Sequence, residues 1–153
     1  MGAVKEIIVR DMTKEDIPAV CKIENQAFSL PWSANAFEES LELPHAIFLV
    51  AECEKVVCGY CGMYQVLQEG DITNVAVLPE YRGIGVGSRL LQELLDKAIA
   101  HDIQDVTLEV RESNEPAIRL YTGFGFENAG IRKGFYEKPK ENAIVMWKRD
   151  IQN

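Results

Sequence analysis

Apolar side chains recur at helical spacing in four stretches of the chain. The clearest is residues 84–100, where an apolar stripe is flanked by polar positions. A second helix is predicted after Thr13 and Asp16, a pair that matches a capping box. Two shorter helices are predicted, one with Ser33 as its candidate cap and one within residues 113–126. The stripe of the clearest helix consists of Leu90, Leu91, Leu94, Leu95, Ala98 and Ile99.

Stretches rich in Val, Ile and aromatic residues, separated by turns, predict strands. The order along the chain is β-α-α-β-β-β-α-β-α-β-β. This order implies an α/β fold with a mixed sheet and helices on both of its faces. The length fits a single domain spanning residues 1–153. The predicted strands cover residues 6–12, 46–53, 56–67, 71–78, 105–112, 127–137 and 142–150.

Composition and charge narrow the classes of function. With 47% hydrophobic and 26% charged residues, the chain is ordinary for a globular domain. No apolar run approaches the roughly 18 residues of a membrane span. The first residues contain no signal-peptide core, so we expect a soluble, cytoplasmic protein with no membrane partner. A formal net charge of −8 disfavours direct binding of nucleic acid.

Candidate metal ligands and nucleophiles are few. Cys58 and Cys61 form one CxxC pair, but residues three apart on a strand point to opposite faces. No second Cys/His pair accompanies them, and His45 and His101 have no evident partners in the sequence. The sequence therefore predicts buried, unpaired thiols and no metal site.

Three glycines alternate at the start of the clearest helix, in PEYRGIGVGSRLL (residues 79–91). Glycine is a poor helix former, but it admits unusual backbone angles and close approach of a ligand. A helix N-terminus offers unpaired N–H groups, and Arg82 adds a cation, so the turn suits a phosphate or pyrophosphate. GxxxxGK[ST] is absent, and Ser88 stands where GxGxxG needs its last glycine. From the glycines alone, a tight turn without a ligand stays an alternative.

The same turn resembles the acetyl-CoA signature of GCN5-related N-acetyltransferases. Arg82-x-x-Gly85-x-Gly87 lies between NVAVLPEY and a Leu-rich helix, and the predicted element order is similar to that fold over essentially the whole chain. FSLPWS, LEVRESN, AIRLY, GFGF, IRKGFY and AIVMW resemble the RimI type, which acetylates the N-terminal alanine of a small-subunit ribosomal protein. The resemblance implies a mostly antiparallel sheet of about seven strands with about four helices. It also implies acetyl-CoA as co-substrate, with no metal.

The resemblance assigns roles to individual residues. Glu109 would be the general base, Tyr121 the general acid, and Asn114 a contact to the cofactor. Attack on the thioester would be direct, in a ternary complex. The backbone that would pair with the pantetheine arm belongs to Val75, Ala76 and Val77. The amides that would hold the pyrophosphate belong to Arg82, Gly83, Ile84, Gly85, Val86, Gly87 and Ser88.

Each catalytic assignment has a structural alternative. Tyr121 shares a helix face with Asn114, but it could be a core residue with its hydroxyl satisfied. Glu109 shares a strand face with Arg111 and could be a salt-bridged structural residue. An α-amine, with a pKa of about 7.7–8.0 against about 10.4 for lysine, is the easier acceptor for a weak carboxylate base. This comparison favours N-terminal acetylation independently of the resemblance.

Two segments are predicted to flank the acceptor groove. Trp32 lies in FSLPWS, and Phe135 and Tyr136 lie in IRKGFYE. The alternative is that these residues close the core, which is the favoured interpretation for Trp32, and that the second segment is a solvated hairpin. Acidic side chains that either receive a basic peptide or are simply solvated are Glu24, Glu38 and Glu39. The competing functions are acetylation of lysine, a polyamine or another small amine, and binding of acetyl-CoA without catalysis.

Overall fold

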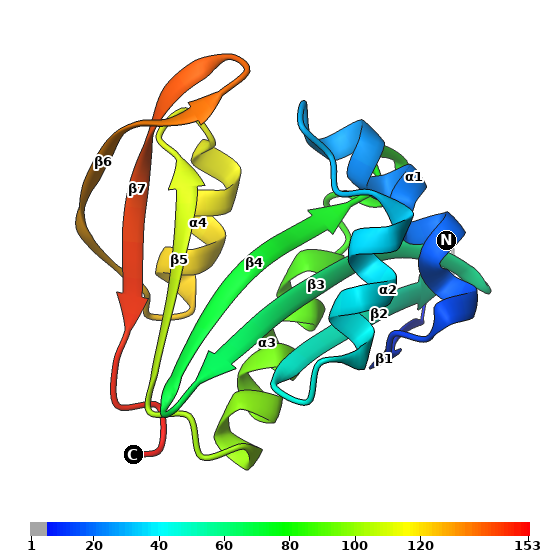
Figure 1. Ribbon diagram of the computed structural model, residues 1–153, viewed down its shortest axis with the longest axis horizontal. Coiled ribbons are helices and arrows are strands. Elements are labelled where there is room, and N and C mark those ends of the chain that lie inside the picture. The colour runs from blue at the N-terminus through cyan, green and yellow to red at the C-terminus, as the bar shows by residue number, and fades with distance from the viewer. Residues whose placement is uncertain (1–5) are drawn as a thin grey trace, which may run out of the picture.

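A seven-stranded sheet organises the computed structural model, which describes residues 6–153 (Figure 1). The strands lie side by side in the order β1-β2-β3-β4-β5-β7-β6. Within the described residues, β4 and β5 are the one parallel pair. The predicted mixed α/β fold is confirmed. The strands are β1 (Ile7–Asp11), β2 (Ala46–Cys53), β3 (Val56–Val66), β4 (Glu69–Val77), β5 (Asp105–Arg111), β6 (Glu127–Glu137) and β7 (Lys140–Lys148).

Helices cover both faces of this sheet, with α1 and α2 on one face and α3 and α4 on the other (Figure 1). Neighbouring residues of β3 show the alternation, because the Tyr60 hydroxyl reaches Glu24 on α1 whereas the Cys61 thiol lies 3.8 Å from the carbonyl oxygen of Leu90 on α3. The sheet is therefore buried between two helical layers where α1 and α3 cross it. The helices are α1 (Ile17–Ala27), α2 (Ala34–Glu42), α3 (Val86–Ala100) and α4 (Glu115–Gly123).

Polar side chains cap α2 and α4, and Ser33 is the cap that the sequence predicts for the first of them. Ser33 Oγ accepts from the Ala36 N–H at 3.1 Å, and Asn114 Oδ1 accepts from the Ala117 N–H at 3.2 Å. The apolar stripe of α3 is buried against the sheet except at Ile99, which is 42% exposed. Apolar periodicity and caps were sufficient to find these helices, because both signals are local.

Strands β4 and β5 diverge along their length, and the divergence positions the site. Their pairing runs from Glu69 opposite Asp105 to Ile72 opposite Leu108 and then stops. At the same point β4 has an extra residue, Thr73, relative to β3, which bends the strand. Beyond it β4 follows β3 while β5 follows β7, and Figure 1 shows the strands opening apart. This part of β4 thus has a strand partner on its β3 side and an open edge toward β5.

The four cysteines are free thiols, as predicted. Cys53, Cys58 and Cys61 are fully buried. Within residues 6–153, no helix is long and apolar enough to span a bilayer. The same part of the chain contains no group of three or more His, Cys, Asp or Glu side chains placed to hold a metal ion.

Candidate active site

The open edge of β4 belongs to Val75, Ala76 and Val77, the residues predicted to pair with a pantetheine arm. They pair with β3 at Cys61, Tyr60 and Gly59, and with no residue of β5. A strand edge of this kind offers backbone N–H and C=O groups to an extended ligand. At its end, the Arg82 guanidinium donates to the Val77 carbonyl at 3.3 Å, which fixes this side chain beside the glycine turn.

After this edge, a short 3₁₀ helix (η2, Pro79–Tyr81) and then the glycine turn lead to the N-terminus of α3. Gly83 and Gly85 have φ of 80° and 94°. Residues with a Cβ rarely adopt this left-handed conformation, whereas glycine adopts it readily. The helix therefore begins at Val86, two residues later than its predicted start. A Cβ at Gly83 or Gly85 would meet nothing within 4 Å, whereas one at Gly87 would lie 3.4 Å from Leu120 on α4. The first two glycines thus shape an open cradle, and the third admits a neighbouring helix.

The N-terminus of α3 has no side-chain cap. In α2 and α4, by contrast, Ser33 and Asn114 supply one. The first N–H groups of a helix have no intrahelical partner and carry partial positive charge. The turn and first residues of α3, from Arg82 to Ser88, therefore present amides that suit an anion. Asn114 caps α4 with its side-chain oxygen, and its predicted contact to the cofactor stays a prediction.

Tyr121 lies on α4 and is 7% exposed, with its ring packed against Phe126 at 5.8 Å between centroids. No group among residues 6–153 hydrogen-bonds its hydroxyl. The oxygen is therefore not fully buried, because no fully buried side-chain oxygen in this part of the chain lacks a partner. The hydroxyl is therefore not the satisfied core group of the structural alternative. Burial raises the pKa of Tyr121, so the phenol stays protonated at neutral and moderately alkaline pH.

Glu109 lies on β5 between the buried residues Leu108 and Val110, and its side chain faces the opposite side of the sheet. Its Oε1 accepts from the Arg132 guanidinium of β6 at 2.9 Å. The salt bridge predicted as the structural alternative is thus present. Asp71 of β4 is opposite Thr107, two residues before Glu109, so the two carboxylates lie on the same face of the sheet. Burial, and next to it the negative charge of Glu109, raise the pKa of Asp71. Two carboxylates from the two diverging strands therefore share this part of the site.

Tyr136 closes the same region from β6. The Arg111 guanidinium lies 4.3 Å from the centre of the Tyr136 ring and donates to the Pro139 carbonyl at 2.9 Å. Burial and the nearby charge of Glu109 raise the pKa of Tyr136 to about 12. Phe135, by contrast, is 44% exposed. The hairpin turn is therefore fixed to β5, with one aromatic ring turned inward and one outward.

Trp32 belongs to an aromatic cluster between α2 and the sheet. Its ring lies 5.4 Å from Phe37, 6.3 Å from Phe48 and 6.4 Å from Tyr64, between centroids, as the favoured core interpretation predicts. Trp32 also lines a cavity of about 420 Å³ beside α2, together with Glu39, Ser40 and Leu43. It is thus partly core and partly accessible.

The two segments predicted to flank the acceptor groove meet in the structure. The Ser29 hydroxyl, in the loop between α1 and α2, donates to the Lys138 carbonyl at the β6–β7 turn. These segments are more than a hundred residues apart in sequence, so no local pattern could show their contact.

The prediction for Glu24 is wrong. Its side chain neither faces solvent nor can receive a peptide, because Glu24 is 1% exposed and its carboxylate accepts hydrogen bonds inside the protein. No local pattern could reveal this group, because the donors to Glu24 lie on β3, on β4 and in the loop after α1. Glu38 and Glu39 are exposed, as predicted.

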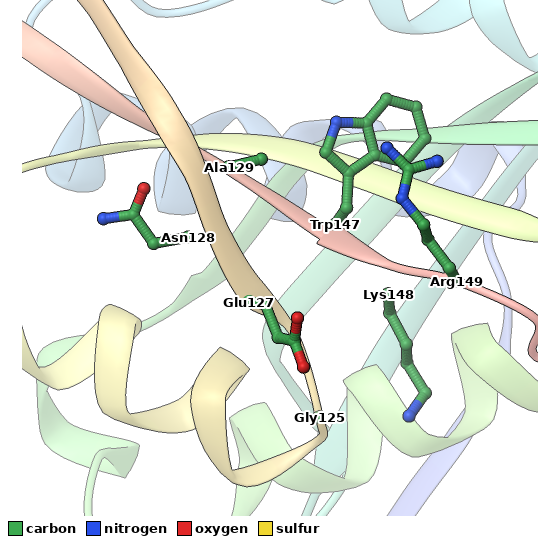
Figure 2. Close-up of a pocket in the computed structure, with 7 residues that line it drawn as sticks. All are labelled: Gly125, Glu127, Asn128, Ala129, Trp147, Lys148 and Arg149. Carbon is green, nitrogen blue, oxygen red and sulfur yellow. The ribbon is translucent and has the colours of Figure 1, made fainter.

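A second cavity, of about 240 Å³, lies at the end of the β6–β7 hairpin away from Tyr136 (Figure 2). The Arg149 guanidinium lies over the Trp147 ring at 4.4 Å, and Lys148 Nζ donates to the Phe124 carbonyl at 2.6 Å. None of the predicted site residues lines this cavity, which consists of Gly125, Glu127, Asn128, Ala129, Trp147, Lys148 and Arg149.

The sheet opens where β4 and β5 part, and the uncapped N-terminus of α3 lies beside the opening, an arrangement that fits the class of N-acetyltransferases. A sequence model described as the acetyltransferase (GNAT) family matches residues 17–126. The chain belongs to that family.

Relatives of this chain include named ribosomal-protein acetyltransferases. It is 42% identical over 140 residues to a Bacillus subtilis protein provisionally named a [ribosomal protein bS18]-alanine N-acetyltransferase, covering 91% of this chain and 93% of the relative. It is 33% identical over 140 residues to the Escherichia coli K12 [ribosomal protein bS18]-alanine N-acetyltransferase, covering 90% and 94%. The crystal structure of the Escherichia coli ribosomal-protein-S18-alanine N-acetyltransferase superposes with a TM-score of 0.86 at 30% identity, covering 95% and 94%.

Proposed function

We propose that this chain is an acetyl-CoA-dependent Nα-acetyltransferase that acts on the N-terminal alanine of a ribosomal protein. The observation that supports it most directly is the open edge of β4, which runs into the uncapped N-terminus of α3. The relatives named above carry the same activity in their names and match almost the whole chain. The substrate is then the N-terminal segment of that protein, with no nucleic acid bound directly.

The residues present fit acetyl-CoA. The open backbone of Val75–Val77 would pair with the pantetheine arm, and the amides of residues 82–88 would hold the pyrophosphate. The cradle has the necessary room, because a Cβ at Gly83 or Gly85 would project into open space. The co-substrate supplies an activated acetyl group, so the protein needs no nucleophile of its own. Backbone N–H groups near Val75–Val77 are the candidate donors to the thioester oxygen.

The chemistry requires a neutral amine and a proton for the departing thiolate. Glu109, directly or through water, accepts the proton that the amine loses. Tyr121 donates its hydroxyl proton to the sulfur as the new C–N bond forms and the C–S bond breaks. Its raised pKa keeps Tyr121 protonated and ready to donate, although it also makes the transfer to a thiolate uphill. The protons balance when Glu109 releases its proton to solvent and Tyr121 takes one up.

The acceptor is an α-amine because side-chain carboxylates in general are weak bases for an ammonium group. The salt bridge to Arg132 already occupies one oxygen of Glu109, the carboxylate proposed to take the proton. Near pH 7.5 about a quarter or more of α-amines are neutral, against about 0.1% of lysine side chains. Trp32, Phe135 and Tyr136 would flank the first residues of the peptide.

The test uses a synthetic peptide that begins with the N-terminal alanine of the ribosomal protein and contains an internal lysine. The matched control is the same peptide with its α-amine blocked. Fragmentation mass spectrometry should place one acetyl group on the alanine α-amine, with the blocked peptide unmodified. Acetylation confined to lysine, or to a polyamine in a parallel assay, would contradict the proposal.

A further inference from the structure

Glu24 is a buried carboxylate that joins three separate segments of the protein. Its oxygens accept from the Tyr60 hydroxyl of β3, from Asn74 Nδ2 of β4 at 3.1 Å, and from the Trp32 backbone N–H at 2.8 Å. Asn74 Nδ2 also lies 2.6 Å from the Tyr60 oxygen. Glu24 is 1% exposed, Tyr60 is fully buried and Asn74 is 9% exposed. Such a group is stable only while its hydrogen bonds are satisfied.

The donors come from the two halves of the proposed site. Asn74 lies between the extra residue Thr73 and the open edge of Val75–Val77, so it fixes the strand that would hold the acyl donor. Trp32 lies in the loop that would flank the acceptor. The bond from Trp32 is made by its backbone, so it fixes the path of the loop rather than a side chain. One carboxylate thus ties the acceptor loop to the cofactor strand.

We propose that Glu24 is a positioning residue that sets the distance between the two bound substrates. The inference rests on the proposed function, because it assigns the two segments to the two substrates of one reaction. Direct attack needs reacting atoms about 3–3.5 Å apart, and a misplacement of about 1 Å can cost about 100-fold in rate. Glu24 acts through Asn74 and Trp32 and contacts neither substrate.

Asp16 offers a matched comparison. Asp16 and Glu24 are the two buried carboxylate residues in the part of the chain that the structure describes. Asp16 accepts from Arg10 at 2.8 Å and from the Thr13 N–H at 2.8 Å, at the other end of α1. It contacts neither the β4 edge nor the acceptor loop. A purely structural buried carboxylate should therefore behave like Asp16.

The experiment compares Glu24→Gln with Asp16→Asn in the full chain. Glu24→Gln keeps the side-chain volume but replaces one acceptor oxygen with an NH2 group that cannot accept. We expect kcat/KM for the alanine peptide to fall about 100-fold, with the acetyl-CoA dissociation constant at its wild-type value. Asp16→Asn should lower the urea midpoint and leave kcat/KM unchanged at temperatures where the protein is folded.

A spectroscopic measurement follows the loop without relying on activity. The chain has two tryptophans, so Trp147→Phe leaves Trp32 as the reporter. Adding Glu24→Gln should shift the Trp32 emission to longer wavelength and increase its quenching by acrylamide, whereas adding Asp16→Asn should do neither. If Glu24→Gln does not fold, Asn74→Leu replaces it in the kinetic assay and should lower kcat/KM while leaving Trp32 emission unchanged.

The outcomes separate the inference from the function it rests on. An unchanged kcat/KM in folded Glu24→Gln, or equal losses in Glu24→Gln and Asp16→Asn, would overturn the positioning role. A wild-type protein that does not acetylate the peptide refutes the proposed function instead, and the fluorescence comparison then still tests whether Glu24 holds the loop.

Discussion

Replacing Tyr121 with phenylalanine removes a single oxygen and separates catalysis from stability. No group among residues 6–153 hydrogen-bonds the Tyr121 hydroxyl, so its loss leaves no partner unsatisfied. The ring keeps its packing against Phe126. We therefore expect the free energy of unfolding to change by no more than about 0.5 kcal/mol. Tyr60→Phe is the contrast, since it removes a hydroxyl bonded to Glu24 and Asn74 and should cost about 1–3 kcal/mol.

The same substitution should slow the reaction strongly. General acid catalysis contributes about 10²–10⁴-fold, so kcat should fall by that factor, which corresponds to about 3–5 kcal/mol of transition-state stabilisation. Binding of acetyl-CoA should be unaffected, because the proposed contacts to it are made by the backbone of β4 and of the glycine turn.

The assay measures release of the coenzyme A thiol in the presence of the alanine peptide, with acetyl-CoA affinity measured by calorimetry and stability by urea denaturation. Acetyl transfer at the wild-type kcat in a folded Tyr121→Phe variant would remove the tyrosine from the mechanism. A large loss of stability would show that the hydroxyl has a structural partner, and the reasoning from its free oxygen would then be wrong.

Three further predictions follow from the site and its surroundings. Gly85→Val should weaken acetyl-CoA binding in calorimetry and cost about 1–2 kcal/mol of stability, because φ is 94° at this position. Gly123→Ala is the control and should do neither, because its Cβ would meet nothing within 4 Å. The kcat/KM for the peptide should rise up to about pH 8, as the α-amine loses its proton. It should then stay level to about pH 10, since burial raises the pKa of Tyr121 and brings that of Tyr136 to about 12. A decline near pH 9 would contradict this. Arg10 holds the pKa of Asp16 below its usual value, so this pair stabilises the fold above about pH 4 and loses that contribution as the pH falls further; urea denaturation should show a steeper acid loss in the wild type than in Asp16→Asn.

The secondary structure and the glycine turn were readable from the sequence. The stripe from Leu90 to Ala98, the cap Ser33 and the alternating glycines each act over a few residues, so a linear pattern is enough to reveal them. Positive φ at Gly83 and Gly85 is also a local property, and it follows from the absence of a side chain. The start of α3 was placed two residues early, because those glycines belong to the turn and not to the helix.

Local sequence patterns establish the elements, their order and the chemical groups available to the reaction. Which of these groups meet depends on contacts between distant segments. Glu24 and Asn74 are 50 residues apart, and Glu109 and Arg132 are 23 apart, so each pair exists only after β3, β4 and the β6–β7 hairpin have taken their places in the sheet. Burial is likewise a property of the assembled layers. For that reason the sequence could not distinguish a solvated Glu24 from a buried one, nor a satisfied Tyr121 hydroxyl from a free one.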